Sequence, residues 1–407
     1  MGYFKTTLSG LSWTAALRGS IRLLAFVRLA ILARLLLPEQ FGAFGVAAMA
    51  LALLEIMTET GINVFLLQEK DGLSQFINTA WLVSIFRGLI IALLVFVSAP
   101  LVANFFSTPD LAPLLYLTCL VPVIRGFINP ANVKFQKDLQ FNREFAYRLT
   151  IFLVESIITV SFAVLTHSAA SFVWGLIFSS LIELALSFIL ISPRPHWSFK
   201  LDQLKLILNR GKWVTGFGLF DYVFTQGDNI TVGRLLGQAP LGVYRTAYSL
   251  STLPVNEIVD TYYKVSLPVY VKLVGSPARL KSAVLKSVGL LSLTSLIISL
   301  AVFFLARPFV LLVLGSAWHA AIPVVKVLAF VGLFRSLSYS FNSLFVALRL
   351  QKYVTFIIFT SMLALLVTIV PAVSRFGVIG AGYSAVVSSL VSLPVAVFLA
   401  AKTLKSL

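Results

Sequence analysis

The sequence predicts an all-α integral membrane protein with about twelve transmembrane helices, in two six-helix lobes around a central polar cavity. Long apolar segments follow one another from residue 11 to residue 401, and short polar connectors separate them. Of the 407 residues, 59% are hydrophobic, and the mean hydropathy is +0.96. An apolar run of about 20 residues crosses the hydrocarbon core as a helix. Several runs also carry charges near their middles, and such charges usually line a polar pathway.

The predicted spans are residues 11–36, 41–67, 78–104, 111–131, 147–166, 170–192, 213–236, 243–271, 284–306, 318–347, 353–374 and 378–401. The longest connector, about 192–212, is too short to fold as a catalytic domain, so we expect no enzyme activity. The single Cys119 cannot form a disulfide framework, and the three histidines have no ligand spacing. No metal site and no cofactor are therefore expected.

The net charge of +17 is distributed unevenly along the chain. On this span map, one set of connectors holds nineteen basic residues and the other set holds two. Basic residues are concentrated in cytoplasmic loops, so both termini are predicted to be cytoplasmic in a multi-pass protein of the bacterial inner (plasma) membrane. The positive charge is explained by orientation and by contact with membrane lipids, so no nucleic-acid partner is expected.

A short connector divides the chain into its two predicted lobes. Residues 1–195 form the first lobe and residues 213–407 the second. Between them, residues 196–212 carry apolar residues such as Leu201 and Leu204 set against Lys205. This pattern predicts an amphipathic helix on the cytoplasmic surface.

The two halves also resemble each other in sequence. Residues 33–47 are echoed 200 positions later at residues 233–247, and the region after Arg125 is echoed 210 positions later after Arg335. The members of each pair are separated by six spans, an even number, so the repeat is parallel, with an axis along the membrane normal.

Polar residues recur at steps of three, four or seven within several spans, which places them on one helix face. The second span has Glu55 and Glu59, and the fourth has Arg125 and Asn129. A charge facing lipid costs roughly 3 kcal/mol, so these stripes must face the interior. The candidate substrate-binding residues are Arg18, Arg22, Arg28, Glu55, Glu59, Arg125, Asn129, Asp221, Asp228, Asp260, Lys264 and Arg335.

Two interpretations of the stripes remain open. In one, the charges pair and position helices, with Glu55 and Glu59 neutralising Arg18 and Arg22. In the other, they line a cavity for a polar substrate. Eleven basic and eight acidic residues lie in or near the spans, so pairing leaves positive charge over. That excess favours a bulky anionic ligand, and the planar fork of arginine suits phosphate.

Several loop motifs resemble one known family. They lie at residues 32–42 (LARLLLPEQFG), 211–216 (GKWVTG), 228–237 (DNITVGRLLG), 241–244 (LGVY), 267–270 (LPVY) and 314–318 (LGSAW). Together they resemble the Wzx-type oligosaccharide flippases, the polysaccharide branch of the multidrug/oligosaccharidyl-lipid/polysaccharide exporter superfamily. The resemblance implies a two-lobed transporter that moves polyprenyl-diphosphate-linked oligosaccharide from the cytoplasmic to the outer leaflet by alternating access.

The resemblance also implies partners and leaves rivals. The lipid-linked oligosaccharide and membrane lipids are the expected partners, and a polysaccharide polymerase and a chain-length regulator are further candidates. A cation-coupled multidrug exporter of the same superfamily typically uses an acid in its first span, but residues 11–36 hold four arginines and no acid. A lipid II flippase is the other alternative, and it shares the cationic cavity.

Overall fold

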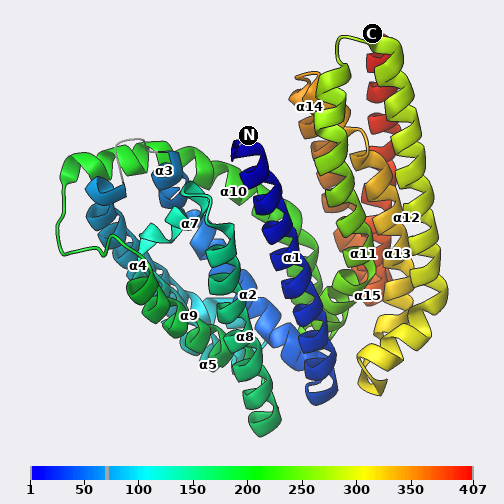
Figure 1. Cartoon of the computed structure of the whole chain (residues 1–407). Helices are drawn as coiled ribbons and strands as arrows, with labels where there is room; N and C mark the ends of the chain where they lie inside the picture. The colour runs from blue at the N-terminus through cyan, green and yellow to red at the C-terminus, as the bar shows by residue number, and fades with distance from the viewer. Residues whose placement is uncertain (1, 69–72, 406–407) are drawn as a thin grey trace. The chain divides into compact units, whose positions relative to one another are not determined.

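The computed structural model describes the backbone of residues 2–68 and 73–405. These residues form α-helices and short 3-10 helices, with no strand in the described ranges, which confirms the predicted all-α class. The chain divides into two units, Met1–Gln226 and Gly227–Leu407, called unit 1 and unit 2 below (Figure 1).

Unit 1 contains many short helices between its long ones. Its elements are α1 (Gly2–Leu35), α2 (Pro38–Met57), α3 (Ile62–Gln68), α4 (Leu73–Phe105), η1 (Pro109–Leu111), α5 (Ala112–Thr118), α6 (Leu120–Gly126), η2 (Pro130–Val133), α7 (Lys134–Lys137), α8 (Phe141–Thr166), α9 (Ala170–Leu190) and the first part of α10 (Leu201–Leu236). The Tyr222 hydroxyl donates to the Met49 carbonyl at 2.8 Å, which ties α10 to α2 within this unit.

Unit 2 is built from longer helices. They are α11 (Gln238–Leu273), α12 (Pro277–Val313), η3 (Ser316–Trp318), α13 (Ala321–Tyr339), α14 (Asn342–Ala347) and α15 (Gln351–Lys405). Within α15 the backbone leaves the helical region at Gly377 (φ 61°), between the predicted spans 353–374 and 378–401. Glycine has no Cβ and therefore adopts a left-handed φ with little strain, so Gly377 permits the kink.

Seven helices in the described ranges are long and apolar enough to cross a membrane, or eight if one bent pair counts as a span. Three further helices, α1, α10 and α11, are 34 to 36 residues long and coincide with predicted spans. A multi-pass membrane protein is therefore supported, and the count of twelve stays a prediction.

The connector between the predicted lobes is part of a longer helix. Helix α10 runs without a break from Leu201 through the predicted linker and into the predicted seventh span. The division between the units falls inside this helix, after Gln226. The side chains of residues 205–217, among them Lys205 of the predicted amphipathic pattern, lie outside the described residues.

The first sequence echo falls at the same structural position in both units. Helix α1 ends at Leu35 and α2 begins at Pro38, while α10 ends at Leu236 and α11 begins at Gln238. The second echo also matches, because α6 ends one residue after Arg125 and α13 ends four residues after Arg335. The repeated motifs therefore mark helix ends in both halves.

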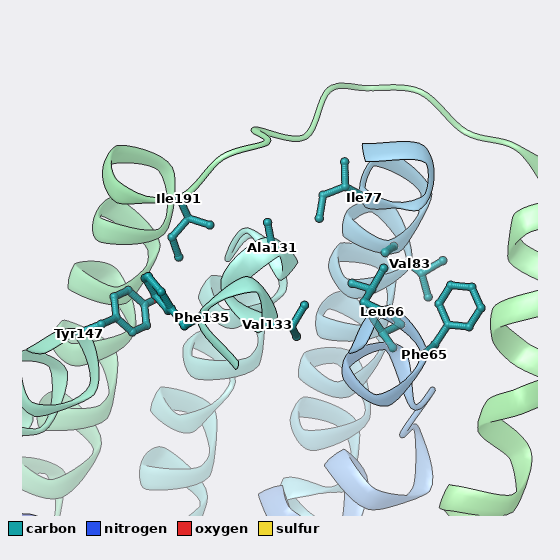
Figure 2. Close-up of a cluster of buried hydrophobic side chains, with 11 residues drawn as sticks. Phe65, Leu66, Ile77, Val83, Ala131, Val133, Phe135, Tyr147 and Ile191 are labelled. Carbon is teal, nitrogen blue, oxygen red and sulfur yellow. The ribbon is translucent and has the colours of Figure 1, made fainter. Parts of the chain in front are cut away.

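A buried apolar cluster holds the short elements of unit 1 together. Figure 2 shows Ala131 and Val133 of η2 between Phe135, Tyr147 and Ile191 on one side and α3 and α4 side chains on the other. Leu66 of α3 is fully buried in this cluster. Burying an apolar side chain of this size contributes about 1.5–3 kcal/mol. The cluster thus fixes the broken segments that form one side of the candidate site.

Helices α4 and α6 approach closely at Gly88, which gives a first prediction. A Cβ at Gly88 would collide with the Pro122 carbonyl oxygen and lie 3.2 Å from the Gly126 Cα. Because both contacts are backbone, neither can rotate away, and Gly88→Ala should lower stability by about 1–3 kcal/mol. Gly289→Ala in α12, where nothing lies within 4 Å of the added Cβ, is the matched control.

The Gly289→Ala change should be neutral or slightly stabilising, since glycine within a helix is destabilising by roughly 0.5–1 kcal/mol relative to alanine. The measurement is the thermal midpoint of each purified variant in detergent, followed by size-exclusion chromatography. Equal midpoints for the two variants would contradict the close approach.

Candidate functional site

A polar cavity of about 230 Å³ lies within unit 1. Charged or polar residues of α2, α3, α4, α6, η2 and α9 line it. These residues are Glu55, Asn63, Ser84, Arg87, Arg125, Asn132 and Glu183. Two arginines and two glutamates therefore line this cavity, so it lacks the surplus of positive charge that the sequence predicted for a central cavity.

Ion pairs join the charged residues around the cavity. Arg125 Nη1 donates to Glu55 Oε1 at 3.2 Å, and Arg87 Nη2 donates to Glu59 Oε2 at 2.9 Å. Arg87 Nη2 also donates to the Glu55 carbonyl at 2.7 Å. Glu55 and Glu59 thus each have an arginine partner from α6 or α4, which the sequence did not predict, and their pairing with Arg18 and Arg22 stays a prediction.

Arg125 is the less constrained of the two cavity arginines. Its side chain is 40% exposed, and the contact to Glu55 is the one hydrogen bond it makes within the described part of the chain. It also acts electrostatically on Glu183. A guanidinium carries five N–H donors in a planar fork. Most of these donors thus remain available to an anion that enters the cavity.

The polar stripes of the second and fourth spans do not follow one continuous helix face. Helix α2 ends at Met57, where the Thr58 hydroxyl donates to the Leu54 carbonyl at 2.7 Å, and Glu59 lies beyond the end. In the fourth span, the segments Pro109–Gly126 and Pro130–Lys137 are bent by 68°. The helical register assumed for both stripes is wrong, because each segment is interrupted.

Asn129 has a structural position at this bend. It is fully buried, its Oδ1 accepts from the Ala131 amide at 3.0 Å, and its Nδ2 donates to the Pro193 carbonyl at 3.1 Å. Its own amide donates to Ser187 Oγ at 3.1 Å. Backbone and side-chain partners thus occupy the groups that would contact a substrate, and Asn129 does not line the cavity.

Arg28 belongs to a separate pair between α1 and α8. Its Nη1 lies 2.5 Å from Glu155 Oε1, and its guanidinium carbon lies 4.9 Å from the centre of the Phe152 ring. Each side chain of the ion pair is 23% exposed. This arrangement positions the two helices, as the pairing interpretation predicts.

We expect Arg28→Ala to lower stability by about 1.5–3 kcal/mol, because it removes a charge-assisted bond and leaves Glu155 half-buried without it. Arg28→Ala with Glu155→Ala should recover part of the loss, since the abandoned carboxylate is gone as well. The amount of folded protein, measured with a fluorescent fusion, tests this. A double variant less stable than both singles would contradict the pairing.

Three other predicted residues lie away from the cavity in unit 1. Arg18 is exposed on α1, Arg22 is half-buried on the same helix with contacts of its own, and Asp221 is exposed on α10. None of them is among the residues that line the cavity.

Unit 2 contains a buried polar network that joins α10, α11 and α13. The Tyr244 hydroxyl donates to Asp228 Oδ2 at 2.8 Å, and the Asn229 amide donates to Asp228 Oδ1 at 2.7 Å. Arg335 Nη1 donates to the Tyr248 hydroxyl at 2.8 Å, and Arg335 also acts electrostatically on Asp228. The structure thus brings together two residues predicted from separate spans.

The remaining candidates of unit 2 lie apart from this network. Asp260 and Lys264 are both exposed on α11, one helical turn from each other. Conversely, two residues that line the cavity of unit 1, Arg87 and Glu183, were not among the substrate-binding candidates predicted from the sequence. Each is a single charge within an apolar span, at residues 78–104 and 170–192, and that isolation was the available signal.

Solved structures with the same helical arrangement are membrane transporters. Superposition on the lipid II flippase MurJ in an inward closed conformation gives a TM-score of 0.72 at 14% identity, over 95% of this chain and 86% of that one. An inward-facing multidrug resistance MATE family transporter of the MOP superfamily gives 0.70 at 14% identity, over 95% of both chains. At these identities the likeness defines the fold.

The family follows from sequence. The family described as "Polysaccharide biosynthesis protein" matches residues 31–323, and the chain belongs to it. Relatives include the lipopolysaccharide biosynthesis protein WzxC of Escherichia coli K12, 26% identical over 85% of this chain and 71% of that protein. The teichuronic acid biosynthesis protein TuaB of Bacillus subtilis 168 is 23% identical over 82% and 69%. The predicted resemblance is confirmed at this level.

Proposed function

We propose that this protein is a flippase that moves polyprenyl-diphosphate-linked oligosaccharide from the cytoplasmic to the outer leaflet by alternating access. Membership of the polysaccharide biosynthesis family and a transporter fold support this function. One relative is the succinoglycan biosynthesis transport protein ExoT of Rhizobium meliloti 1021, 23% identical over 80% of this chain and 66% of that protein. Transport is the activity named both for this relative and for the solved structures of the same fold.

One observation about the site carries the proposal for the substrate's charged end. Arg125 reaches a cavity within unit 1, is 40% exposed, and uses one hydrogen bond to Glu55. Its unused N–H donors can form two parallel bonds to a phosphate. The neighbouring Ser84, Asn132 and Glu183 offer donors and acceptors to the sugar hydroxyls that follow the diphosphate. A polar site of this kind suits a phosphorylated glycan better than an apolar cation.

The same proposal places the protein in its surroundings. We infer a position in the bacterial inner membrane with both termini in the cytoplasm, because the predicted connectors of one set hold nineteen of twenty-one connector basic residues. A polymerase and a chain-length regulator would act on the exported repeat units. The division of the chain into lobes 1–195 and 213–407, joined by residues 196–212, remains our proposal.

The test is complementation of a bacterial strain that lacks its own polysaccharide flippase and carries the cognate glycosyltransferases. The strain should accumulate lipid-linked repeat units without this protein and restore surface polysaccharide with it. Resistance to cationic dyes in an exporter-deficient strain would favour the multidrug alternative instead. Growth of a strain depleted of its lipid II flippase would favour the lipid II flippase alternative. Dye resistance or such growth, without restored surface polysaccharide, would contradict the proposal.

A further inference from the structure

Unit 2 has a second cavity whose chemistry differs from that of the polar site. It has a volume of about 590 Å³ and lies between α11 and α12, which Figure 1 shows as neighbouring helices joined by a short turn. The apolar side chains that line it include Ile258, Val265, Val269, Leu290 and Leu291. Val265 and Leu290 are 61% and 64% exposed, so the groove is open along its length.

The hydroxyl groups on the floor of the groove are bonded to one another. The Tyr262 and Tyr270 hydroxyls lie 2.9 Å apart, and the Tyr270 hydroxyl is also hydrogen-bonded to Ser287. The Tyr262 hydroxyl additionally donates to the Ser340 carbonyl at 3.0 Å. Because these groups satisfy each other, the surface they present favours hydrocarbon over a sugar or a drug-like polar molecule.

Basic residues extend both walls of the groove to the α11–α12 turn. Lys272 is three residues after Val269 on α11, and Arg279 is four residues before Ala283 on α12, so each continues the face that lines the groove. Both are exposed. From residue 261 to residue 407 the sequence has thirteen basic residues and no Asp or Glu, so no acid of this stretch offsets them.

We propose that this groove binds an anionic phospholipid of the bilayer, with an acyl chain between α11 and α12 and its phosphate against Lys272 and Arg279. The predicted orientation puts the turn on the cytoplasmic side, where the leaflet is anionic, and basic sites between transmembrane helices there bind such headgroups. Glu257, the acid at the far end of the groove, is fifteen residues from Lys272, about 22 Å along the helix. The hydrocarbon of one leaflet is about 15 Å deep, so the acyl chain of the bound lipid ends before it reaches Glu257.

The chain provides a matched set of variants. Lys272→Ala with Arg279→Ala removes the two cations on the groove faces, while Lys281→Ala removes an exposed cation two residues after Arg279 on α12 and therefore on another face of that helix. Val265→Trp fills the groove, while Leu285→Trp adds the same ring at a residue that is 57% exposed on α12 and does not line it. All five substitutions, in four variants, are at exposed positions, so folding should survive them.

Native mass spectrometry of the purified full-length protein, delipidated and then given cardiolipin or phosphatidylcholine, tests the proposal. We expect the wild type, Lys281→Ala and Leu285→Trp to retain cardiolipin over phosphatidylcholine, and the Lys272/Arg279 pair and Val265→Trp to retain at least fivefold less cardiolipin. Equal retention of both lipids, or equal losses in Lys281→Ala and the pair, would overturn the site. Retention of a polyprenyl diphosphate but not of cardiolipin would assign the groove to the transported lipid and would also overturn it.

Discussion

Replacing Arg125 with Ala should lower export of the lipid-linked oligosaccharide by about ten- to a hundredfold, while the protein still inserts and accumulates. The change removes charge-assisted bonds to phosphate, each worth about 1.5–3 kcal/mol, and every 1.4 kcal/mol is tenfold. Arg125→Lys should restore only part of the activity, because an ammonium cannot reproduce the bidentate fork. Surface polysaccharide and protein level, measured in the same cells, check this result.

Two further variants separate substrate binding from helix positioning. If Arg125 serves only as the partner of Glu55, Arg125→Ala should fold poorly and the added change Glu55→Ala should restore it. Arg148→Ala is the control, because Arg148 is also paired, donating to Glu144 Oε1 at 2.8 Å, but does not line the cavity. Full export by a well-folded Arg125→Ala protein would remove the support for a phosphate contact.

Asp228→Ala should destabilise the protein by about 1.5–3 kcal/mol. Asp228 is 7% exposed and accepts hydrogen bonds from the Tyr244 hydroxyl and the Asn229 backbone amide. Its replacement leaves both buried donors without this carboxylate acceptor. Tyr244→Phe should cost less, because it removes one of these donors together with its need for an acceptor. The thermal midpoint of each purified variant measures the effect.

A double-mutant cycle makes this prediction specific to the pair. Asp228→Ala combined with Tyr244→Phe should cost clearly less than the sum of the single changes, since contacting residues couple. Asp221→Ala, seven residues earlier on the same helix at an exposed position, should stay within about 0.5 kcal/mol of the wild type. Additive losses at Asp228 and Tyr244 would contradict the network.

Hydrophobic pattern and loop motifs predicted the helical class and the positions where helices end. The motif around Arg34 and its echo around Arg234 both fall at such ends, because a motif of a few residues determines a local turn. The breaks after Met57 and at Pro130 were missed. The Asn129–Pro130 pair is itself a turn signal, since proline disfavours helix at the preceding residue. The steps of four and three residues from Arg125 through Asn129 to Asn132 suggested a continuous helix instead.

The choice of ion-pair partners could not be predicted from spacing. Glu55 meets Arg125, seventy residues away, and Glu59 meets Arg87, because the bend of the fourth span and the contact of α4 with α6 bring these residues together. Such pairs depend on tertiary packing rather than on the period of one helix. The structure also shows how the two arginines of the second sequence echo differ. Both lie near a helix end, but Arg125 is open to a cavity and Arg335 is hydrogen-bonded to Tyr248.

Transbilayer movement in proteoliposomes that contain the purified protein and a fluorescent polyprenyl-diphosphate oligosaccharide measures the proposed flippase activity directly. A membrane-impermeant quencher reports how fast the label appears in the opposite leaflet. We expect the wild type to exceed protein-free liposomes clearly, Arg125→Ala to reach at most a tenth of its rate, and a label without the diphosphate to move no faster than in empty liposomes. Movement at the same rate with and without Arg125, or with and without the diphosphate, would contradict the proposed transport of a diphosphate-linked oligosaccharide through the Arg125 cavity.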